Sequence, residues 1–176
     1  MENLGIIRKV DELGRIVIPK EIRKILDIKS GSSLEISVNE ERELVLKKFS
    51  EVKNLTDSLS LFMESFFALF QIPIILCDEE KIVYVVGVNK KEFLDKKLSS
   101  EVLGIDCKET KLFNGNLIDA QKSVFEDNLI ICLYSEGFLC GKIILVKKEE
   151  GIAFTGEVLS SIKLIVEYIS RLLNFE

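Results

Sequence analysis

The first fifty residues of the chain alternate between short apolar runs and polar turns. Residues 5–10 and 15–18 are typical of short β-strands, and residues 11–14 between them are typical of a turn that ends in glycine. Pro19 suits the start of a helix, and the apolar residues after it follow helical spacing, namely Ile22, Ile25 and Leu26. This stretch is therefore predicted to form two strands followed by a helix.

Two further strands are predicted before residue 50. Leu34, Ile36 and Val38 alternate with polar residues, which is the period of a strand with one buried face. Residues 44–49 supply its partner after a polar turn at residues 39–42. A unit this short has a marginal core unless a disulfide or a metal supports it, and the sequence offers neither. We therefore expect two chains to interleave their strands and share one core.

Two longer segments repeat apolar residues at spacings of three and four, which predicts amphipathic helices over residues 52–70 and 157–174. The apolar positions of the first are Leu55, Leu59, Phe62, Phe66 and Leu69, and those of the second are Val158, Ile162, Ile165, Ile169 and Leu172. Such a seam either pairs helices of different chains or packs a helix on its own domain. The spacing leaves both arrangements open.

The chain between these helices has the pattern of an antiparallel sheet. Strand-like runs lie at residues 72–77, 81–87, 128–134 and 138–146. Tight turns at residues 78–80 and 135–137 join them into two hairpins. Residues 89–100 are predicted to be helical, and residues 103–127 to form a long, less regular crossover. This order predicts an α+β domain with helices on one side of the sheet.

The elements divide the chain into two domains. We expect one domain at residues 1–50 and a second at residues 71–176, with residues 51–70 as a linker or first helix. A share of 47% apolar and 30% charged residues supplies enough core for folded domains. No stretch has the about 20 unbroken apolar residues of a membrane span, and acidic residues interrupt the N-terminus where a signal peptide is apolar. We expect a cytoplasmic protein with no membrane partner.

The residue types limit the chemistry of the chain. Histidine is absent, which removes the commonest general base and the commonest transition-metal ligand. The four cysteines lack the spacing of a metal site, and three of them, Cys77, Cys132 and Cys140, lie in strand-like runs. We expect reduced, mostly buried thiols, with Cys107 in a loop as the candidate for a reactive thiol. The chain is therefore expected to be no enzyme and to hold no metal or cofactor.

Charge is distributed unevenly along the chain, whose net charge is −5. Residues 1–48 hold ten basic and nine acidic residues, whereas residues 49–176 hold fourteen and twenty. Six basic residues face three acidic ones within residues 8–24, and they are Arg8, Lys9, Arg15, Lys20, Arg23 and Lys24. A local basic stretch on an acidic chain is typical of a phosphate-binding surface. From charge alone, a solvated surface is the alternative.

A longer motif connects this stretch to a family. Residues 5–24, GIIRKVDELGRIVIPKEIRK, resemble the DNA-binding domain of AbrB-type transition-state regulators, and the likeness covers residues 3–49. The resemblance implies a swapped-hairpin barrel formed by two chains, in which Arg8, Arg15, Arg23 and Lys24 face double-stranded DNA. Lys24 stands where the family has arginine, so it keeps phosphate attraction but loses a bidentate contact. Lys9 and Lys20 fit either a DNA contact or a solvated surface.

With a second domain attached, the whole chain resembles the AbrB-type regulators of late sporulation genes in Bacillus and Clostridium relatives. The resemblance implies a nucleoid-associated transcription regulator that activates or represses, with a sensory or oligomerising C-terminal domain. The element order of that domain resembles a GAF domain, a fold that often binds small molecules. Residues 106–116 either border a ligand pocket or form a plain solvated loop. The ligand itself is not identified by the sequence.

Two other functions fit parts of the sequence. Some antitoxins use the same swapped-hairpin fold and neutralise a toxin through a short, disordered tail. Here the tail is long and has the periodicity of a folded domain, which favours the regulator. An enzyme in the C-terminal half is disfavoured because no nucleophile pairs with a base and no glycine-rich phosphate loop occurs. We expect a homodimer through the N-terminal domain and a tetramer through the two amphipathic helices.

Overall fold

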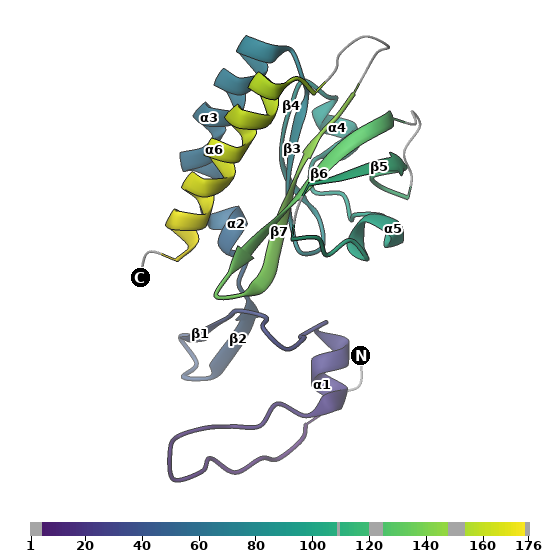
Figure 1. Cartoon of the computed structure of the whole chain (residues 1–176). Coiled ribbons are helices and arrows are strands. Elements are labelled where there is room, and N and C mark those ends of the chain that lie inside the picture. Colours follow the sequence, from purple (N-terminus) through teal and green to yellow (C-terminus); the bar gives the residue numbers. More distant parts are fainter. Residues whose placement is uncertain (1–4, 109, 120–124, 148–153, 175–176) are drawn as a thin grey trace. The chain divides into compact units, whose positions relative to one another are not determined.

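The structure is a computed structural model that describes residues 5–108, 110–119, 125–147 and 154–174 (Figure 1). The chain divides into two compact units, Met1–Phe49 and Ser50–Glu176, and each unit contains one sheet. Among the described residues, no helix is both long and apolar enough to cross a membrane.

Residues 5–49, the described part of the N-terminal unit, contain one short helix and one hairpin. Helix α1 spans Lys20–Ile25, strand β1 spans Leu34–Val38, and strand β2 spans Leu44–Lys48. The two strands pair antiparallel, as the alternating pattern predicts. At their turn the backbone N–H of Glu43 donates to Asn39 Oδ1 at 2.8 Å. The helix and the second hairpin of this domain are therefore confirmed.

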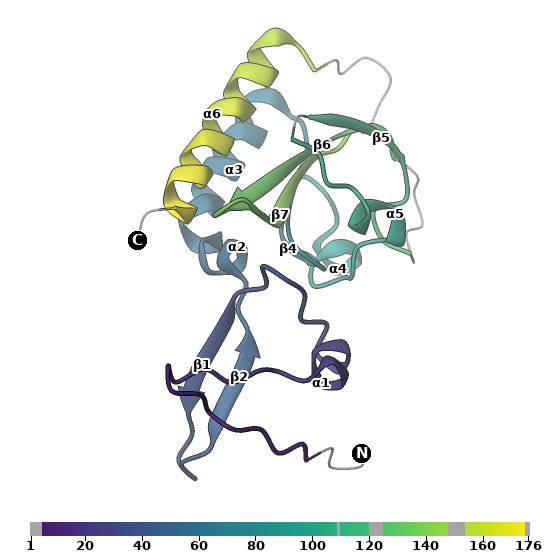
Figure 2. The ribbon, with the colours of Figure 1, turned by 60° about the horizontal axis from the view of Figure 1, so that its bottom comes forward.

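The predicted strands at residues 5–10 and 15–18 are not formed within the chain. Both segments are outside regular structure, and Figure 2 shows them as a plain loop. The turn between them is present, because the N–H of Gly14 donates to the Asp11 carbonyl and the N–H of Asp11 donates to the Arg15 carbonyl, each at 3.0 Å. A strand needs a neighbouring strand to satisfy its backbone groups. Nothing in the described part of this unit supplies one.

Apolar side chains of the N-terminal unit are left in contact with solvent. Ile7 is 92% exposed, Val17 75% and Ile36 64%, although Ile36 was expected on the buried face of its strand. Other exposed apolar residues of the unit are Val10, Leu13, Ile16, Ile25, Leu26, Val38 and Leu44. Helix α1 buries none of its residues. A single chain therefore gives this unit almost no hydrophobic core.

The C-terminal unit is built on a five-stranded antiparallel sheet. Its strands are β3 (Ile74–Asp78), β4 (Ile82–Val86), β5 (Lys111–Gly115), β6 (Phe125–Ser135) and β7 (Phe138–Leu145), in the order β4-β3-β7-β6-β5. Both predicted hairpins are present. Glu136 and Gly137 join β6 to β7 with φ values of 49° and 84°, which suit the tight turn expected there. Strand β5 lies within the predicted crossover and was missed.

Five helices are present in the described residues of this unit. They are α2 (Glu51–Asn54), α3 (Thr56–Phe70), α4 (Lys90–Phe93), α5 (Ser100–Leu103) and α6 (Gly156–Leu173). The helix predicted over residues 52–70 is divided at Leu55, and the Ser50 hydroxyl accepts the N–H of Lys53 to cap α2. Only α4 forms within the helix predicted over residues 89–100. Asp95 follows α4 by two residues and has φ 60°, a left-handed conformation that an α-helix cannot contain.

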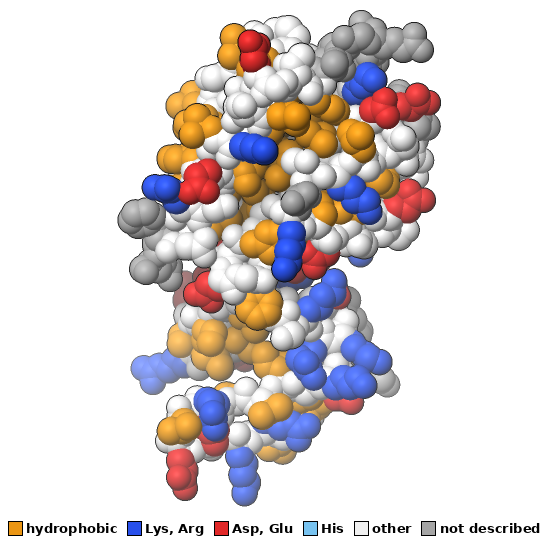
Figure 3. All heavy atoms as spheres, viewed as in Figure 1, with side chains coloured by type: hydrophobic (Ala, Val, Ile, Leu, Met, Phe, Trp, Pro, Cys, Tyr) orange, Lys and Arg blue, Asp and Glu red, His pale blue; other side chains and the backbone are white. Residues whose placement is uncertain are grey.

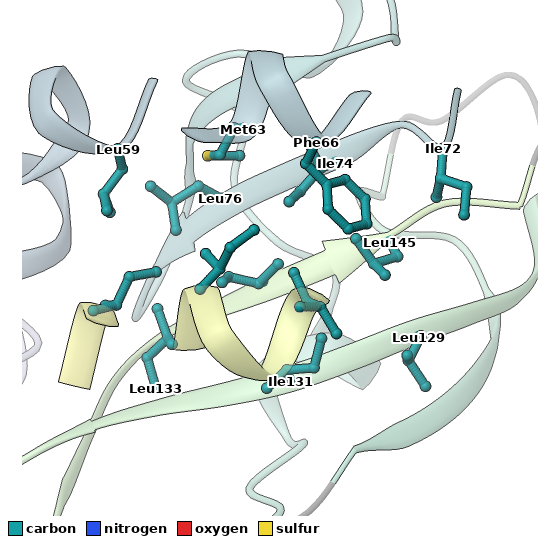
Figure 4. Packing of buried hydrophobic residues seen from close by; sticks show 14 of the residues in the cluster. Leu59, Met63, Phe66, Ile72, Ile74, Leu76, Leu129, Ile131, Leu133 and Leu145 are labelled. Carbon is teal, nitrogen blue, oxygen red and sulfur yellow. The ribbon is translucent and has the colours of Figure 1, made fainter. Parts of the chain in front are cut away.

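The long helices α3 and α6 cover one face of the sheet, side by side in both ribbon views (Figures 1 and 2). Their buried residues meet the sheet in one apolar cluster, part of which is shown in Figure 4. From α3 the cluster includes Leu59, Met63 and Phe66, and from α6 it includes Val158, Ile162, Ile165 and Ile169. The apolar series of α6 therefore packs on its own domain.

The seam predicted on α3 is only partly correct. Leu59 and Phe66 are buried, but Phe62 is 40% exposed and Leu69 is 74% exposed. Met63 takes the core position between Leu59 and Phe66. Because an α-helix repeats every 3.6 residues, the heptad positions drift away from the face that meets the sheet.

The opposite face of the sheet is also covered, which the prediction of helices on one side omits. A second apolar cluster joins sheet residues such as Ile75 and Ile144 to Phe93 of α4 and Val102 of α5. Successive strand residues point to opposite faces, so the two clusters take alternate residues of β3, β6 and β7. The domain thus has three layers.

Candidate nucleic-acid interface

The six basic residues between positions 8 and 24 lie on two neighbouring segments of the N-terminal unit. Arg8, Lys9 and Arg15 belong to the irregular segment before Pro19, and Lys20, Arg23 and Lys24 belong to α1. All six are exposed. Figure 3 shows Lys and Arg side chains gathered on this unit beside apolar ones. All six basic side chains are therefore open to solvent in the described part of the chain.

The turn at residues 11–15 orients Arg15. Asp11 Oδ1 accepts the backbone N–H groups of Leu13 at 3.0 Å and of Arg15 at 2.8 Å. Asp11 Oδ2 accepts the Nε–H of Arg15 at 2.8 Å. One carboxylate thus fixes both the turn and the guanidinium that follows it. Because the guanidinium has further N–H donors, its two Nη groups can bind another acceptor.

Asp11 is held in its charged form by the same contacts. The backbone N–H of Arg15 lowers the pKa of Asp11 most, and the Arg15 guanidinium lowers it further. Hydrogen bonds to the ionised carboxylate favour that form. The sequence placed Asp11 in a turn and counted it as an acid within a basic stretch, but its contact with the Arg15 side chain was missed. The spacing of four residues between Asp11 and Arg15 is the signal that was available.

Helix α1 presents the second basic group. The N–H of Arg23 donates to the Pro19 carbonyl at 2.9 Å, so the helix begins directly after the proline, as predicted. Arg23 and Lys24 lie in its last turn, where positive charge is favourable at the helix C-terminus. In the described part of the chain neither residue forms an ion pair. Their charges are therefore available to a phosphate group.

Cys107 does not belong to the basic surface, because it lies in the C-terminal unit. Cys107 lies between α5 and β5 and is half-buried, with its sulfur 3.1 Å from the sulfur of Cys132 on β6. Burial, and then the contact with Cys132, raise the pKa of the Cys107 thiol to about 11. Cys107 was the candidate for a reactive thiol in a loop, and its pairing with Cys132 was missed because 25 residues separate the two.

Comparison with known families divides the chain near the boundary between its two units. Residues 7–53 match the family described as antidote-toxin recognition MazE, bacterial antitoxin. Residues 54–174 match the family described as stage V sporulation protein T C-terminal, transcription factor. The second match covers more than half of the chain.

Two relatives from Bacillus subtilis (strain 168) agree with this division. Stage V sporulation protein T is 32% identical over 160 residues, which cover 85% of this chain and 87% of the relative. Transition state regulatory protein AbrB is 53% identical over 49 residues, which cover 28% of this chain and 50% of the relative. The resemblance of residues 3–49 to AbrB-type domains is confirmed, and so is the likeness of the whole chain to a two-domain sporulation regulator.

Proposed function

This chain belongs to the stage V sporulation protein T C-terminal, transcription factor family, and we propose that it is a DNA-binding transcription regulator of late sporulation genes. It activates or represses them from the nucleoid, without enzymatic activity. The observation that carries this function is the exposed basic set on a unit that matches AbrB over 49 residues. The set comprises Arg8, Lys9, Arg15, Arg23 and Lys24.

Two chains form the DNA-binding unit in this proposal. The segments at residues 5–10 and 15–18 lack partner strands within the chain, and the apolar residues beside them are exposed. A second copy supplies both the strands and the apolar surface, as a swapped-hairpin barrel does. Each barrel then carries two turns with Arg15 and two copies of α1. The guanidinium groups of the arginines can make bidentate contacts to guanine edges or phosphates, and Lys9 and Lys24 add positive charge.

The two parts of the chain carry opposite net charge, which directs DNA to the N-terminal unit. Positive charge attracts the phosphate backbone and supplies most non-specific affinity. The −6 balance of residues 49–176 opposes binding through any other part of the chain. Contact with DNA is therefore limited to the N-terminal unit in this proposal.

A tetramer is proposed to form through the outer faces of α3 and α6. Leu61 on α3 is 71% exposed and Leu164 on α6 is 67% exposed, although both helices bury their other face. Phe62 and Tyr168 extend this apolar surface, with ring centroids 5.1 Å apart. Two linked barrels gain affinity for paired sites because the first contact raises the effective concentration of the second.

The C-terminal unit is proposed to be a GAF-like sensory domain. Its sheet has an apolar face covered by α4, α5 and the segment before β5, which is where a small molecule would be held. A ligand or partner that shifted α3 against α6 would change the spacing of the two barrels. DNA binding would then change without any contact to an arginine.

The antitoxin function has one observation in its favour, the family match of residues 7–53. Against it, the chain after residue 50 is a folded domain with a five-stranded sheet rather than a short tail. The regulator is therefore preferred. An antitoxin would bind a toxin through its C-terminal part, whereas the proposed regulator binds a ligand or another copy of the chain there.

In vitro selection from random double-stranded DNA with the purified full chain tests the proposal. We expect a defined motif to be enriched, and we expect a variant that combines Arg8→Ala, Arg15→Ala and Arg23→Ala to enrich none while remaining folded. Selection that enriches no motif with the unaltered chain would contradict the regulator. Neutralisation of a co-expressed toxin by the chain would support the antitoxin instead.

A further inference from the structure

Cys107 and Cys132 form a close pair on the sheet face opposite α3 and α6. Cys132 belongs to the apolar cluster of that face, and Cys107 packs against it. Their sulfur atoms are 3.1 Å apart, within hydrogen-bonding distance with either thiol as donor. The backbone N–H of Cys107 also donates to the Cys132 sulfur at 3.3 Å. Both thiols are free in this structure.

The segment at residues 105–107 docks on β6 through contacts on both sides of this pair. The Ile105 carbonyl accepts the Cys132 thiol at 3.9 Å. The Tyr134 hydroxyl donates to Asp106 Oδ1 at 2.5 Å. Cys132 and Tyr134 are two residues apart on β6, and both contact this segment. The pairing of the two sulfurs is therefore set by the fold and does not rest on one contact.

The two thiols differ in access. Cys107 is half-buried, whereas Cys132 is only 6% exposed. A small oxidant can therefore reach Cys107 first, and Cys132 is placed behind it. A cysteine that an oxidant can reach, beside a second cysteine that can resolve the sulfenic acid, can form a reversible disulfide. Because the pKa of Cys107 is raised to about 11, little of it is thiolate at neutral pH, so we expect the oxidation to be slow there and faster at higher pH.

A buried lysine lies beside Cys132 on the neighbouring strand. Lys142 on β7 lies directly opposite Cys132 in the strand register and is 1% exposed. Residues that face each other across an antiparallel pair share one face of the sheet. Burial raises the pKa of the Cys77 thiol, and the charge of Lys142, which also lies opposite Cys77 in the register with β3, lowers it in part.

We propose that Cys107 and Cys132 are an oxidation site, at which hydrogen peroxide converts the two thiols into a disulfide that fastens residues 105–107 to β6. The sulfurs must approach by about 1 Å, since an S–S bond is close to 2 Å long. The segment that carries Cys107 lies outside regular structure, so this approach requires no change in a helix or strand on its side. The site is separate from the basic surface and does not depend on the proposed DNA binding.

The reaction balances with peroxide as the oxidant. The Cys107 thiolate attacks one peroxide oxygen, the O–O bond breaks, and a sulfenic acid forms while the other oxygen leaves as water after protonation. The Cys132 sulfur then attacks the Cys107 sulfur, the S–O bond breaks, and a second water leaves. The two thiols lose two electrons and two protons in total, and the peroxide is reduced to two waters.

Peptide mapping of the full chain tests the pairing. The protein is treated with hydrogen peroxide, unreacted thiols are blocked with a maleimide under denaturing conditions, and a non-reducing digest is analysed by mass spectrometry. We expect an intrachain link between Cys107 and Cys132, with Cys77 and Cys140 blocked. Cys107→Ser and Cys132→Ser should abolish the link.

Cys140→Ser is the matched control. Cys140 is also half-buried, but its thiol donates to the Leu133 carbonyl at 3.4 Å instead of to another sulfur. This variant should form the link as fully as the unaltered chain does. A link between chains, a link to Cys77 or Cys140, or stable sulfenic or sulfinic acid on Cys107 with Cys132 still blocked would each overturn the proposal.

Thermal melting tests whether the link fastens the segment. A disulfide between residues this far apart restricts the unfolded chain, so we expect the melting temperature of the C-terminal unit to rise by about 5 °C on oxidation. Dithiothreitol should reverse the rise, and Cys107→Ser should show none. A fully linked protein whose melting temperature does not change would contradict the fastening.

Discussion

Arg15 and Arg23 are the most informative single residues in the proposed complex, because an arginine can bind two acceptors at once. We expect Arg15→Ala and Arg23→Ala each to abolish specific DNA binding while leaving the fold intact. Each lost phosphate contact should also flatten the slope of log affinity against log salt by about 0.9. Binding titrations at several salt concentrations measure both effects.

Lys47→Ala is a suitable control for these variants, because it removes one positive charge from an exposed position on β2 of the same unit. Specific binding should survive this change. Circular dichroism of all three variants checks the fold. If both arginine variants bind like the unaltered chain, these residues do not belong to the interface.

Asp11 gives the N-terminal turn a dependence on pH. The contacts from Arg15 lower the pKa of Asp11, so its folded pKa lies below the unfolded value of about 3.9. Ionised Asp11 therefore stabilises the turn above that value, and this stabilisation is lost as the pH falls through the folded pKa. We expect the stability advantage of the unaltered chain over Asp11→Asn to be constant from about pH 5 to 7 and to shrink below about pH 4.

Thermal melts of the two proteins over this pH range measure that advantage. An advantage that stays the same down to about pH 3 would contradict the role given to the Asp11 charge.

At the scale of residues, the sequence was informative wherever a side chain acts alone. The exposure of the six basic residues at positions 8–24 followed from their charge, whereas the burial of Lys142 did not. The pairs were not predicted: Asp11 with Arg15 depends on the conformation of a turn, and Cys107 with Cys132 depends on a loop that docks on a strand. Neither conformation is determined by composition or periodicity.

At the scale of elements, α3 and α6 each have a buried face and an exposed apolar face. Leu61→Glu combined with Leu164→Glu places charge on the exposed face, and we expect it to reduce tetramers to dimers. Binding to paired DNA sites should weaken more than binding to single sites, because avidity is lost. Light scattering at micromolar concentration measures the assembly.

Leu59→Ala is the matched control for this surface. Leu59 lies two residues before Leu61 but is fully buried, so its truncation should lower the stability of the C-terminal unit by about 2–5 kcal/mol and leave assembly intact. A dimeric unaltered chain would contradict the proposed tetramer. So would a double glutamate variant that remains tetrameric.

Elements with regular apolar patterns were predicted well, and irregular ones were not. Both hairpins of the C-terminal sheet have buried central strands with continuous apolar runs. Strand β5 lies at the sheet edge, where Lys111 and Leu112 are both exposed, so its sequence lacks a strand pattern. The helix predicted over residues 89–100 was too long because Asp95 adopts a positive φ that its neighbours do not signal.

At the scale of the whole molecule, the two units differ in how much of their fold one chain contains. Residues 50–174 have two apolar clusters that cover both faces of a sheet. Residues 5–49 leave Ile7, Val17 and Ile36 exposed and two predicted strands unformed. The sequence predicted those strands from their pattern, and a pattern does not show which chain supplies the partner. This is why the N-terminal unit agrees with the prediction only in part.

Melting of a fragment with residues 1–50 across a range of protein concentrations tests the central claim most directly. If two chains share one core, folding and association are a single event, and the melting temperature must rise with concentration. We predict such a rise, by several degrees for each tenfold increase in concentration. A folded fragment whose melting temperature is the same at every concentration would be a stable monomer, and the two-chain DNA-binding unit would be wrong.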